Sequence, residues 1–92
     1  MSELGKDEKT KAHKEIAYEA IANSSKRLKT QPDDHSDWLM RGLAYILLGD
    51  QNKAIHDLRK AVQLSQQNNA TASCQIAQNM LRSLEAKQKN NS

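Results

Sequence analysis

The sequence has 92 residues, of which 37% are hydrophobic and 27% charged, and its formal net charge is +3. This length allows a single domain with only a thin core. The positive charge is slight and forms no dense basic stripe with interleaved aromatic residues, so the composition disfavours nucleic-acid binding. One proline, three glycines and few β-branched residues favour helices and an all-α fold.

A first helix is expected over residues 7–30, after a disordered segment over residues 1–6. Asp7 and Glu8 suit its beginning, because negative charge is favourable at a helix N-terminus. Its apolar residues form one narrow stripe: Ala12, Ile16, Ala20, Ile21 and Leu28. This helix can cover a neighbouring element, but it would not be stable alone.

Two further helices are expected on either side of a glycine turn. Pro32 ends the first helix, because proline disfavours a helical conformation at the residue before it, and a second helix then covers about residues 36–48. Gly49 can adopt a left-handed conformation, and Asp50 can cap the helix that follows. That third helix covers about residues 51–65.

A fourth helix is expected over residues 70–87, after the polar break "SQQNNATAS". Its apolar residues form one stripe: Ala72, Ile76, Ala77, Met80, Leu81 and Leu84. The last residues, 88–92, are polar and are expected to be disordered. Links this short between helices make neighbouring helices antiparallel.

Small and aromatic residues recur at fixed spacings through the second and third helices: Trp38, Gly42, Tyr45, Gly49, Ala54, Leu58 and Ala61. This pattern resembles the tetratricopeptide repeat, a helix–turn–helix unit of about 34 residues. Gly42 and Ala54 would permit close approach of the paired helices, while Trp38 and Tyr45 fill the space on either side of that contact. Ala61 would let the next helix approach.

The resemblance implies one full repeat over residues 35–68, within a single domain over residues 1–92. The expected fold is all-α, with about four helices stacked as antiparallel hairpins in a right-handed superhelix. The N-terminal helix resembles part of a preceding repeat, and the helix over 70–87 resembles a capping helix. Three residues depart from the family pattern, since Arg41 stands where leucine is usual, Leu58 where an aromatic residue is usual, and Gln66 where proline is expected.

The second helix carries more apolar residues than this pattern requires. Leu39, Leu43 and Ile46 form a stripe about 100° around the helix from Trp38, and Leu47 lies beyond it. In tetratricopeptide repeats this second stripe resembles the ligand-facing surface, so these four residues are the expected partner-binding residues. Repeats that grip the C-terminal carboxylate of a chaperone tail carry Lys, Arg and Asn at these positions. This chain has Leu39, Leu43 and Ile46 there instead, which argues against an adaptor of that type.

Three things could cover the stripe of Leu39, Leu43 and Ile46: the N-terminal helix, a second copy of the chain, or an apolar segment of a partner. Repeat arrays normally need about three repeats for stability. One full repeat with a partial repeat and a cap falls below that number, which favours self-association.

The sequence therefore favours a non-catalytic protein–protein interaction module, acting as an adaptor, scaffold or assembly factor, with a protein or peptide partner. The alternative is a structural homodimer subunit whose apolar stripe is consumed by self-association. A nucleic-acid-binding helical protein is the least favoured class. Its candidate contacts would be Lys6, Lys9, Lys11, Lys14, Lys26, Arg27 and Lys29.

The sequence predicts no enzyme activity, no cofactor and no metal site. His13, His35 and His56 are far apart and none has metal-ligand spacing to Cys74. His56 and Asp57 are neighbours on a helix and are expected to point in different directions. A single cysteine cannot form an internal disulfide, which fits a cytoplasmic location, and no apolar segment reaches the length of about 20 residues that spans a membrane.

Overall fold

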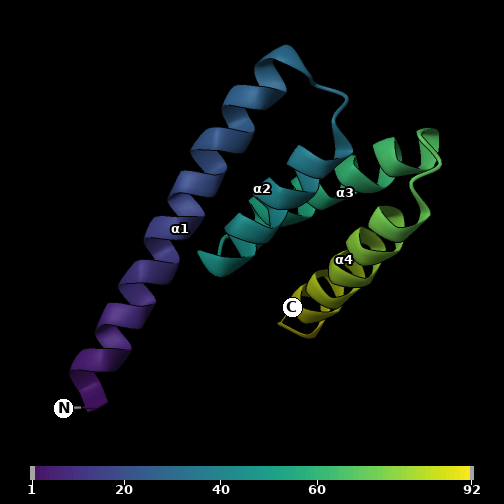
Figure 1. Ribbon diagram of the computed structural model, residues 1–92. Helices are drawn as coiled ribbons and strands as arrows, with labels where there is room; N and C mark the ends of the chain where they lie inside the picture. Colours follow the sequence, from purple (N-terminus) through teal and green to yellow (C-terminus); the bar gives the residue numbers. More distant parts are fainter. Residues whose placement is uncertain (1, 92) are drawn as a thin grey trace.

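A computed structural model describes the backbone of residues 2–91 and the side chains of residues 11–89. It contains four helices in this range: α1 (Ser2–Thr30), α2 (His35–Leu47), α3 (Gln51–Gln67) and α4 (Thr71–Asn91). No strand occurs between residues 2 and 91, so the predicted all-α class and helix number are confirmed. α2 and α3 form an antiparallel hairpin, with α1 packed against α2 and α4 packed against α3 (Figure 1).

The outer helices are longer than the sequence pattern indicated. α1 begins at Ser2 rather than at residue 7, and α4 continues to Asn91 rather than ending at residue 87. The segments expected to be disordered are therefore helical over residues 2–6 and 88–91, while Met1 and Ser92 lie outside the described residues. The physical reason is that extending an existing helix fixes one residue per hydrogen bond, whereas nucleating it is the costly step.

The turn at Gly49 and Asp50 follows the chemistry that the sequence predicted, and polar residues also form the other two turns. Asp34 caps α2, and its carboxylate accepts a hydrogen bond from the backbone N–H of Ser36 at 3.0 Å. Gly49 has a φ of 80°, and Asp50 caps α3 by accepting from the backbone N–H of Lys53 at 3.2 Å. Between α3 and α4, Asn69 takes the left-handed conformation with a φ of 57°, which asparagine tolerates better than most residues.

The apolar core lies between the hairpin and α4. Its buried residues are Ala54, Ile55 and Leu58 of α3 together with Leu84 of α4. Partly buried side chains pack against this cluster from α2 and α4: Leu39, Tyr45, Ile46, Met80 and Leu81. The broad apolar face of α3 is therefore covered from both sides, which explains why α3 carries more buried residues than α2.

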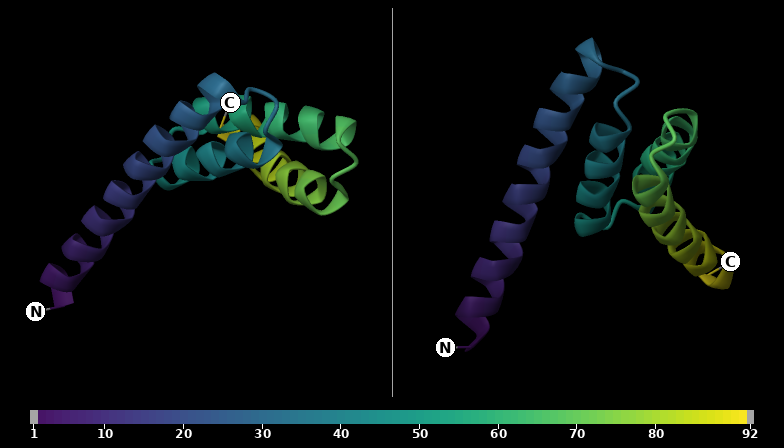
Figure 2. Two further views of the ribbon diagram at one scale, coloured as in Figure 1. Left: turned by 45° about the horizontal axis from the view of Figure 1, so that its top comes forward. Right: turned by 45° about the vertical axis from the view of Figure 1, so that its right-hand side comes forward.

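The two ends of the stack present polar faces to solvent. α1 has 29 residues and α2 has 13, so the N-terminal part of α1 projects about 24 Å beyond the hairpin at about 1.5 Å per residue (Figure 2). The side of α1 away from α2 is exposed: Lys11, Glu15, Glu19, Ala22 and Lys26. Terminal helices of a repeat stack need such polar outer faces. In the range 2–91, no helix is long and apolar enough to cross a membrane.

Candidate functional site

The hairpin closes most tightly at Gly42. A Cβ atom at this position would lie 3.1 Å from Cγ and Cδ2 of Leu58 and 3.5 Å from the backbone oxygen of Ala54. Leu58 and Ala54 are fully buried. The absence of a side chain at Gly42 is therefore what allows α2 and α3 to approach, as the spacing of small residues predicted.

Trp38 and Tyr45 lie on either side of this close contact. The indole Nε1 of Trp38 donates a hydrogen bond to the backbone oxygen of Pro32 at 2.8 Å, and its ring centroid lies 6.1 Å from that of His56 on α3. Tyr45 packs against the core cluster, and Nζ of Lys53 lies 5.6 Å from its ring centroid. The two rings thus connect α2 to α3 at both ends of the contact.

Arg41 joins three helices. Its Nε and Nη2 atoms donate to the carboxylate of Asp57 on α3 at 2.7 and 2.9 Å, and Nη1 donates to Oγ of Ser25 on α1 at 3.1 Å. The guanidinium also lies 4.8 Å from the ring centroid of Trp38. The side chain of Asp57 is only 2% exposed, so the pair is a nearly buried, bidentate ion pair.

The electrostatics of this pair keep Arg41 charged. The hydrogen bond to Asp57 raises the pKa of Arg41 above its ordinary value, against the opposing effect of partial burial. A raised pKa means that the folded state favours the protonated form, so this contribution to stability is fully present at physiological pH. It would be lost only as the pH rises through the raised pKa, in strong alkali.

His56 also contacts this carboxylate, which corrects the expectation that His56 and Asp57 point in different directions. Nδ1 of His56 lies 3.2 Å from Oδ1 of Asp57. Neighbouring Cβ atoms on a helix do diverge by about 100°. The side chain of His56 is nevertheless long enough for its ring nitrogen to turn back toward the carboxylate, while 72% of that side chain remains exposed.

The four expected partner-binding residues occupy two different environments. Leu39 and Ile46 are partly buried and pack against the core cluster, whose members lie on α3 and α4. Leu43 is half-buried. Leu47 is 58% exposed, and Met40, on the same side of α2, is 49% exposed. The four residues are therefore divided: Leu39 and Ile46 support the core, Leu43 is intermediate, and Leu47 faces solvent.

The N-terminal helix α1 does not cover Leu39 and Ile46. α1 meets a different side of α2, where Arg27 Nε donates to Oδ1 of Asp37 at 2.8 Å and Arg41 contacts Ser25. The angle between Asp37 and Leu39 on a helix is about 200°. The helix that reaches toward Leu39 and Ile46 is instead α4, because its Leu84 belongs to the cluster against which they pack.

Beside Ile46 the surface is hollowed. We call this hollow the apolar groove, and its volume is about 340 Å³. It is lined by Ile46 of α2 and by five residues of α4: Asn79, Met80, Ser83, Leu84 and Lys87. Most of its exposed lining is apolar, although Asn79, Ser83 and Lys87 also line it, so it suits an apolar group better than a charged one.

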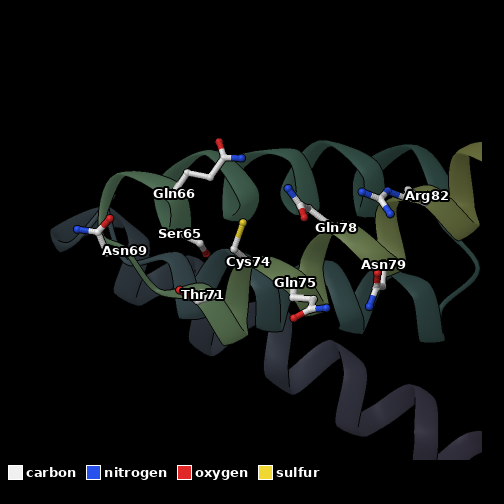
Figure 3. Close-up of a pocket in the computed structure, with 9 residues that line it drawn as sticks. All are labelled: Ser65, Gln66, Asn69, Thr71, Cys74, Gln75, Gln78, Asn79 and Arg82. Atoms are coloured by element: carbon white, nitrogen blue, oxygen red, sulfur yellow. The ribbon is translucent and has the colours of Figure 1, made fainter.

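A second hollow of different chemistry lies between α4 and the end of α3 (Figure 3), and Asn79 lines both hollows. We call it the polar hollow, and its volume is about 380 Å³. Five carboxamide side chains line it: Gln66, Asn69, Gln75, Gln78 and Asn79. The remaining lining residues are Ser65, Thr71, Cys74 and Arg82.

Sequence reasoning missed the Asp57 pair and the polar hollow. The signal for the pair was Arg41 itself, since a charged residue at a position where the family usually has leucine needs a partner in the fold. The signal for the polar hollow was the run of Gln and Asn after residue 65. From the sequence alone this run indicates only a break between helices, because its residues meet only when α4 folds back on α3.

The other site classes remain without support in the described residues. No group of three or more His, Cys, Asp or Glu side chains among residues 11–89 could hold a metal ion. Of the basic residues considered for nucleic acid, Lys11, Lys14, Lys26 and Lys29 are exposed and Arg27 is paired with Asp37. The side chains of Lys6 and Lys9 lie outside the described residues.

Comparison with known proteins agrees with the hairpin geometry. Residues 38–68 match the family model described as the tetratricopeptide repeat. No curated protein and no solved structure gave a significant match to the chain. The matched stretch begins at Trp38, spans the Gly42–Leu58 contact and ends just after α3. This match and the close approach at Gly42 agree, so residues 38–68 of the chain form a tetratricopeptide repeat, packed between α1 and α4.

Proposed function

We propose that this protein is a non-catalytic protein–protein interaction module, an adaptor, scaffold or assembly factor that binds an apolar segment of a partner. A tetratricopeptide repeat suggests protein–protein interaction in general. The observation that carries the proposal is the exposed apolar row on α2, where Met40 and Leu47 are 49% and 58% exposed and Leu43 lies half-buried between them. The single cysteine, Cys74, supports a cytoplasmic location for this function.

The shape of this surface favours a helical partner segment. Met40, Leu43 and Leu47 are spaced by three and four residues, so they form a row about 10 Å long on one side of α2. An amphipathic helix carries its apolar side chains at the same spacing and could lie along this row. One of its side chains would then enter the apolar groove beside Ile46. In this proposal Leu39 and Ile46 form the floor of the surface, and Leu43 and Leu47 form its contact edge.

The polar ends of the stack argue against the homodimer alternative in its simplest form. Copies that stack end to end would bury the charged outer face of α1, which includes Lys11, Glu15 and Lys26, against polar residues of α4. Burying charged groups without partners is unfavourable. A homodimer would therefore have to use the same apolar row as a partner, and the oligomeric state is the measurement that separates the two functions.

The test compares Leu47→Glu with the wild-type protein. Leu47 is more than half exposed, so the substitution should leave the fold intact, which circular dichroism checks. Affinity capture from the native cell, with mass spectrometry, should recover a partner with the wild-type protein and lose it with Leu47→Glu. Light scattering at micromolar concentration should give a monomer for both proteins.

Tyr18→Glu is the matched control, because Tyr18 is 63% exposed and borders a different hollow, near Tyr45 and Lys53. It should retain the same partner as the wild type. The proposal is wrong if Leu47→Glu and the wild type recover the same proteins. A wild-type dimer that Leu47→Glu converts to a monomer would establish the homodimer alternative instead.

A further inference from the structure

The polar hollow has a lining that matches the hydrogen-bonding groups of a peptide chain. Five of its nine lining residues are carboxamides, and each carboxamide carries both a donor and an acceptor. A peptide group carries the same pair, one N–H and one C=O. The lining contains no acidic, aliphatic or aromatic side chain. It can therefore form hydrogen bonds with the main chain of a ligand.

The length of the polar hollow also suits an extended peptide. Thr71, Gln75, Gln78 and Arg82 are spaced by four, three and four residues, so they form one row along α4. This row is about 16 Å long at about 1.5 Å per residue, which equals about five residues of extended chain at about 3.3 Å each. Figure 3 shows Asn69 and Thr71 at one end of the hollow and Arg82 at the other.

Arg82 supplies an unused positive charge. The other three arginines, Arg27, Arg41 and Arg59, each donate to a carboxylate at distances between 2.7 and 3.1 Å. Arg82 has no carboxylate partner among the described residues, and no acidic residue lines the polar hollow. A guanidinium in this position can bind a carboxylate with two parallel hydrogen bonds.

Ser65 adds a hydroxyl without a partner to this lining. It lines the polar hollow together with Cys74 (Figure 3) and is only 1% exposed. Its Oγ atom has no hydrogen-bond partner within the described structure. Most buried side-chain polar atoms have a partner, and one without a partner destabilises the protein. A ligand carbonyl entering the hollow would provide the missing partner.

We propose that the polar hollow binds an extended, acidic peptide segment of another protein. The carboxamides of Gln75 and Gln78 would bind its main chain, and Arg82 would bind an acidic side chain or carboxylate near one end. This site differs from the apolar groove in its chemistry and shares only Asn79 with it. Binding here does not depend on the proposed function of the apolar row.

The probe is the synthetic peptide acetyl-Asp-Ala-Ala-Ala-Asp-amide, because an acidic residue at each end lets either chain direction place a carboxylate at Arg82. Nitrogen-15-labelled protein would be titrated with this peptide and with its Asn-Ala-Ala-Ala-Asn counterpart. We expect saturable shifts in the amide signals of residues 65–82. The dissociation constant should be about tenfold weaker for the asparagine peptide and for Arg82→Gln.

Two further variants separate specific binding from general attraction. Lys26→Gln removes one positive charge from the exposed face of α1 and should bind the acidic peptide as tightly as the wild type. Gln78→Met keeps the length of the side chain without its hydrogen bonds and should weaken binding by about threefold or more. The proposal is overturned if the wild type shows no saturable shifts, if Arg82→Gln binds as the wild type does, or if Gln78→Met has no effect. The Leu47→Glu variant should bind this peptide normally, so the outcome is independent of the apolar row.

Discussion

The two sides of α2 hold their neighbouring helices by different means. Toward α1, ionic and polar contacts join Arg27 to Asp37 and Arg41 to Ser25, beside a few buried apolar residues: Ala17, Leu28 and Ala44. Toward α3 and α4, the contacts are mainly apolar, and they form the core cluster. The difference indicates that burial of apolar surface on the α3 side supplies most of the stability, whereas polar contacts on the α1 side set the position of α1.

Arg41 is the residue that belongs to both sides. Its bidentate pair with Asp57 crosses to α3, while its third nitrogen reaches α1. Loss of this residue should therefore affect both sides at once. Residues that act on only one side should have smaller and distinguishable effects, because substitutions without shared partners are approximately additive.

Arg41→Leu should have the largest effect. It installs the residue that is usual in the family but leaves the buried carboxylate of Asp57 with only the exposed His56 beside it, so it should lower the free energy of unfolding by about 3–5 kcal/mol. Urea denaturation would measure the loss. The double variant Arg41→Leu/Asp57→Ala removes both charges and should recover most of the stability. A loss below about 1 kcal/mol for the single variant would show that the pair is less buried than its 2% exposed carboxylate indicates.

Two leucine-to-alanine variants compare how much apolar packing on the α3 side and on the α1 side of α2 contributes to stability. Leu58 is fully buried in the core cluster, so Leu58→Ala should lower the free energy of unfolding by about 4 kcal/mol. Leu28, on α1, is 8% exposed and lies close to the end of its helix, so Leu28→Ala should lower it by about 2 kcal/mol. Thermal and urea denaturation would both report the difference. Equal losses would show that the α1 side is packed as tightly as the core.

Local sequence was sufficient to predict the hairpin but not the contacts between distant helices. The contact of Gly42 with Leu58 and the turn at Gly49 depend on spacings within one repeat, and both were predictable from the pattern. The pairing of Arg41 with Asp57 depends on which side chains face each other across the hairpin. A sequence pattern that assigns charges to exposed faces cannot recognise two charges that bury each other.

The candidate site shows the same limit. The stripe containing Leu39, Leu43 and Ile46 was visible from the helical period, but its division between core and surface depends on where α4 packs. That position depends on small buried residues such as Ala61 and Ala77 and on the turn at Asn69 between α3 and α4. The polar hollow exists only because α4 returns along α3, so no single segment of the sequence predicts it.

Gly42→Ala tests the close approach on the α3 side and should have a smaller effect. Alanine favours helix over glycine by about 1 kcal/mol, but its Cβ would lie 3.1 Å from the enclosed side chain of Leu58. We expect overpacking to exceed that gain, with a net loss of about 1 kcal/mol in the free energy of unfolding. In the double variant Gly42→Ala/Leu58→Ala, the substitution at Gly42 should instead be stabilising. If Gly42→Ala alone is stabilising, Leu58 can move and the contact does not limit the approach of the helices.

Ser24→Ala should have an effect as small as that of Gly42→Ala and of the opposite sign. Ser24 lies on the buried side of α1, is 0% exposed, and its Oγ atom has no partner within the described structure. Replacing it removes an unsatisfied hydroxyl and adds a better helix former, so the free energy of unfolding should rise by about 1 kcal/mol.

Its neighbour Ser25 is the matched control, because its Oγ accepts a hydrogen bond from Arg41 at 3.1 Å. Ser25→Ala should therefore lower the free energy of unfolding by about 1 kcal/mol. The two adjacent serines should therefore differ in sign, and urea denaturation would measure both. If Ser24→Ala is as destabilising as Ser25→Ala, then Ser24 has a partner of its own and polar contacts on the α1 side extend beyond Arg41.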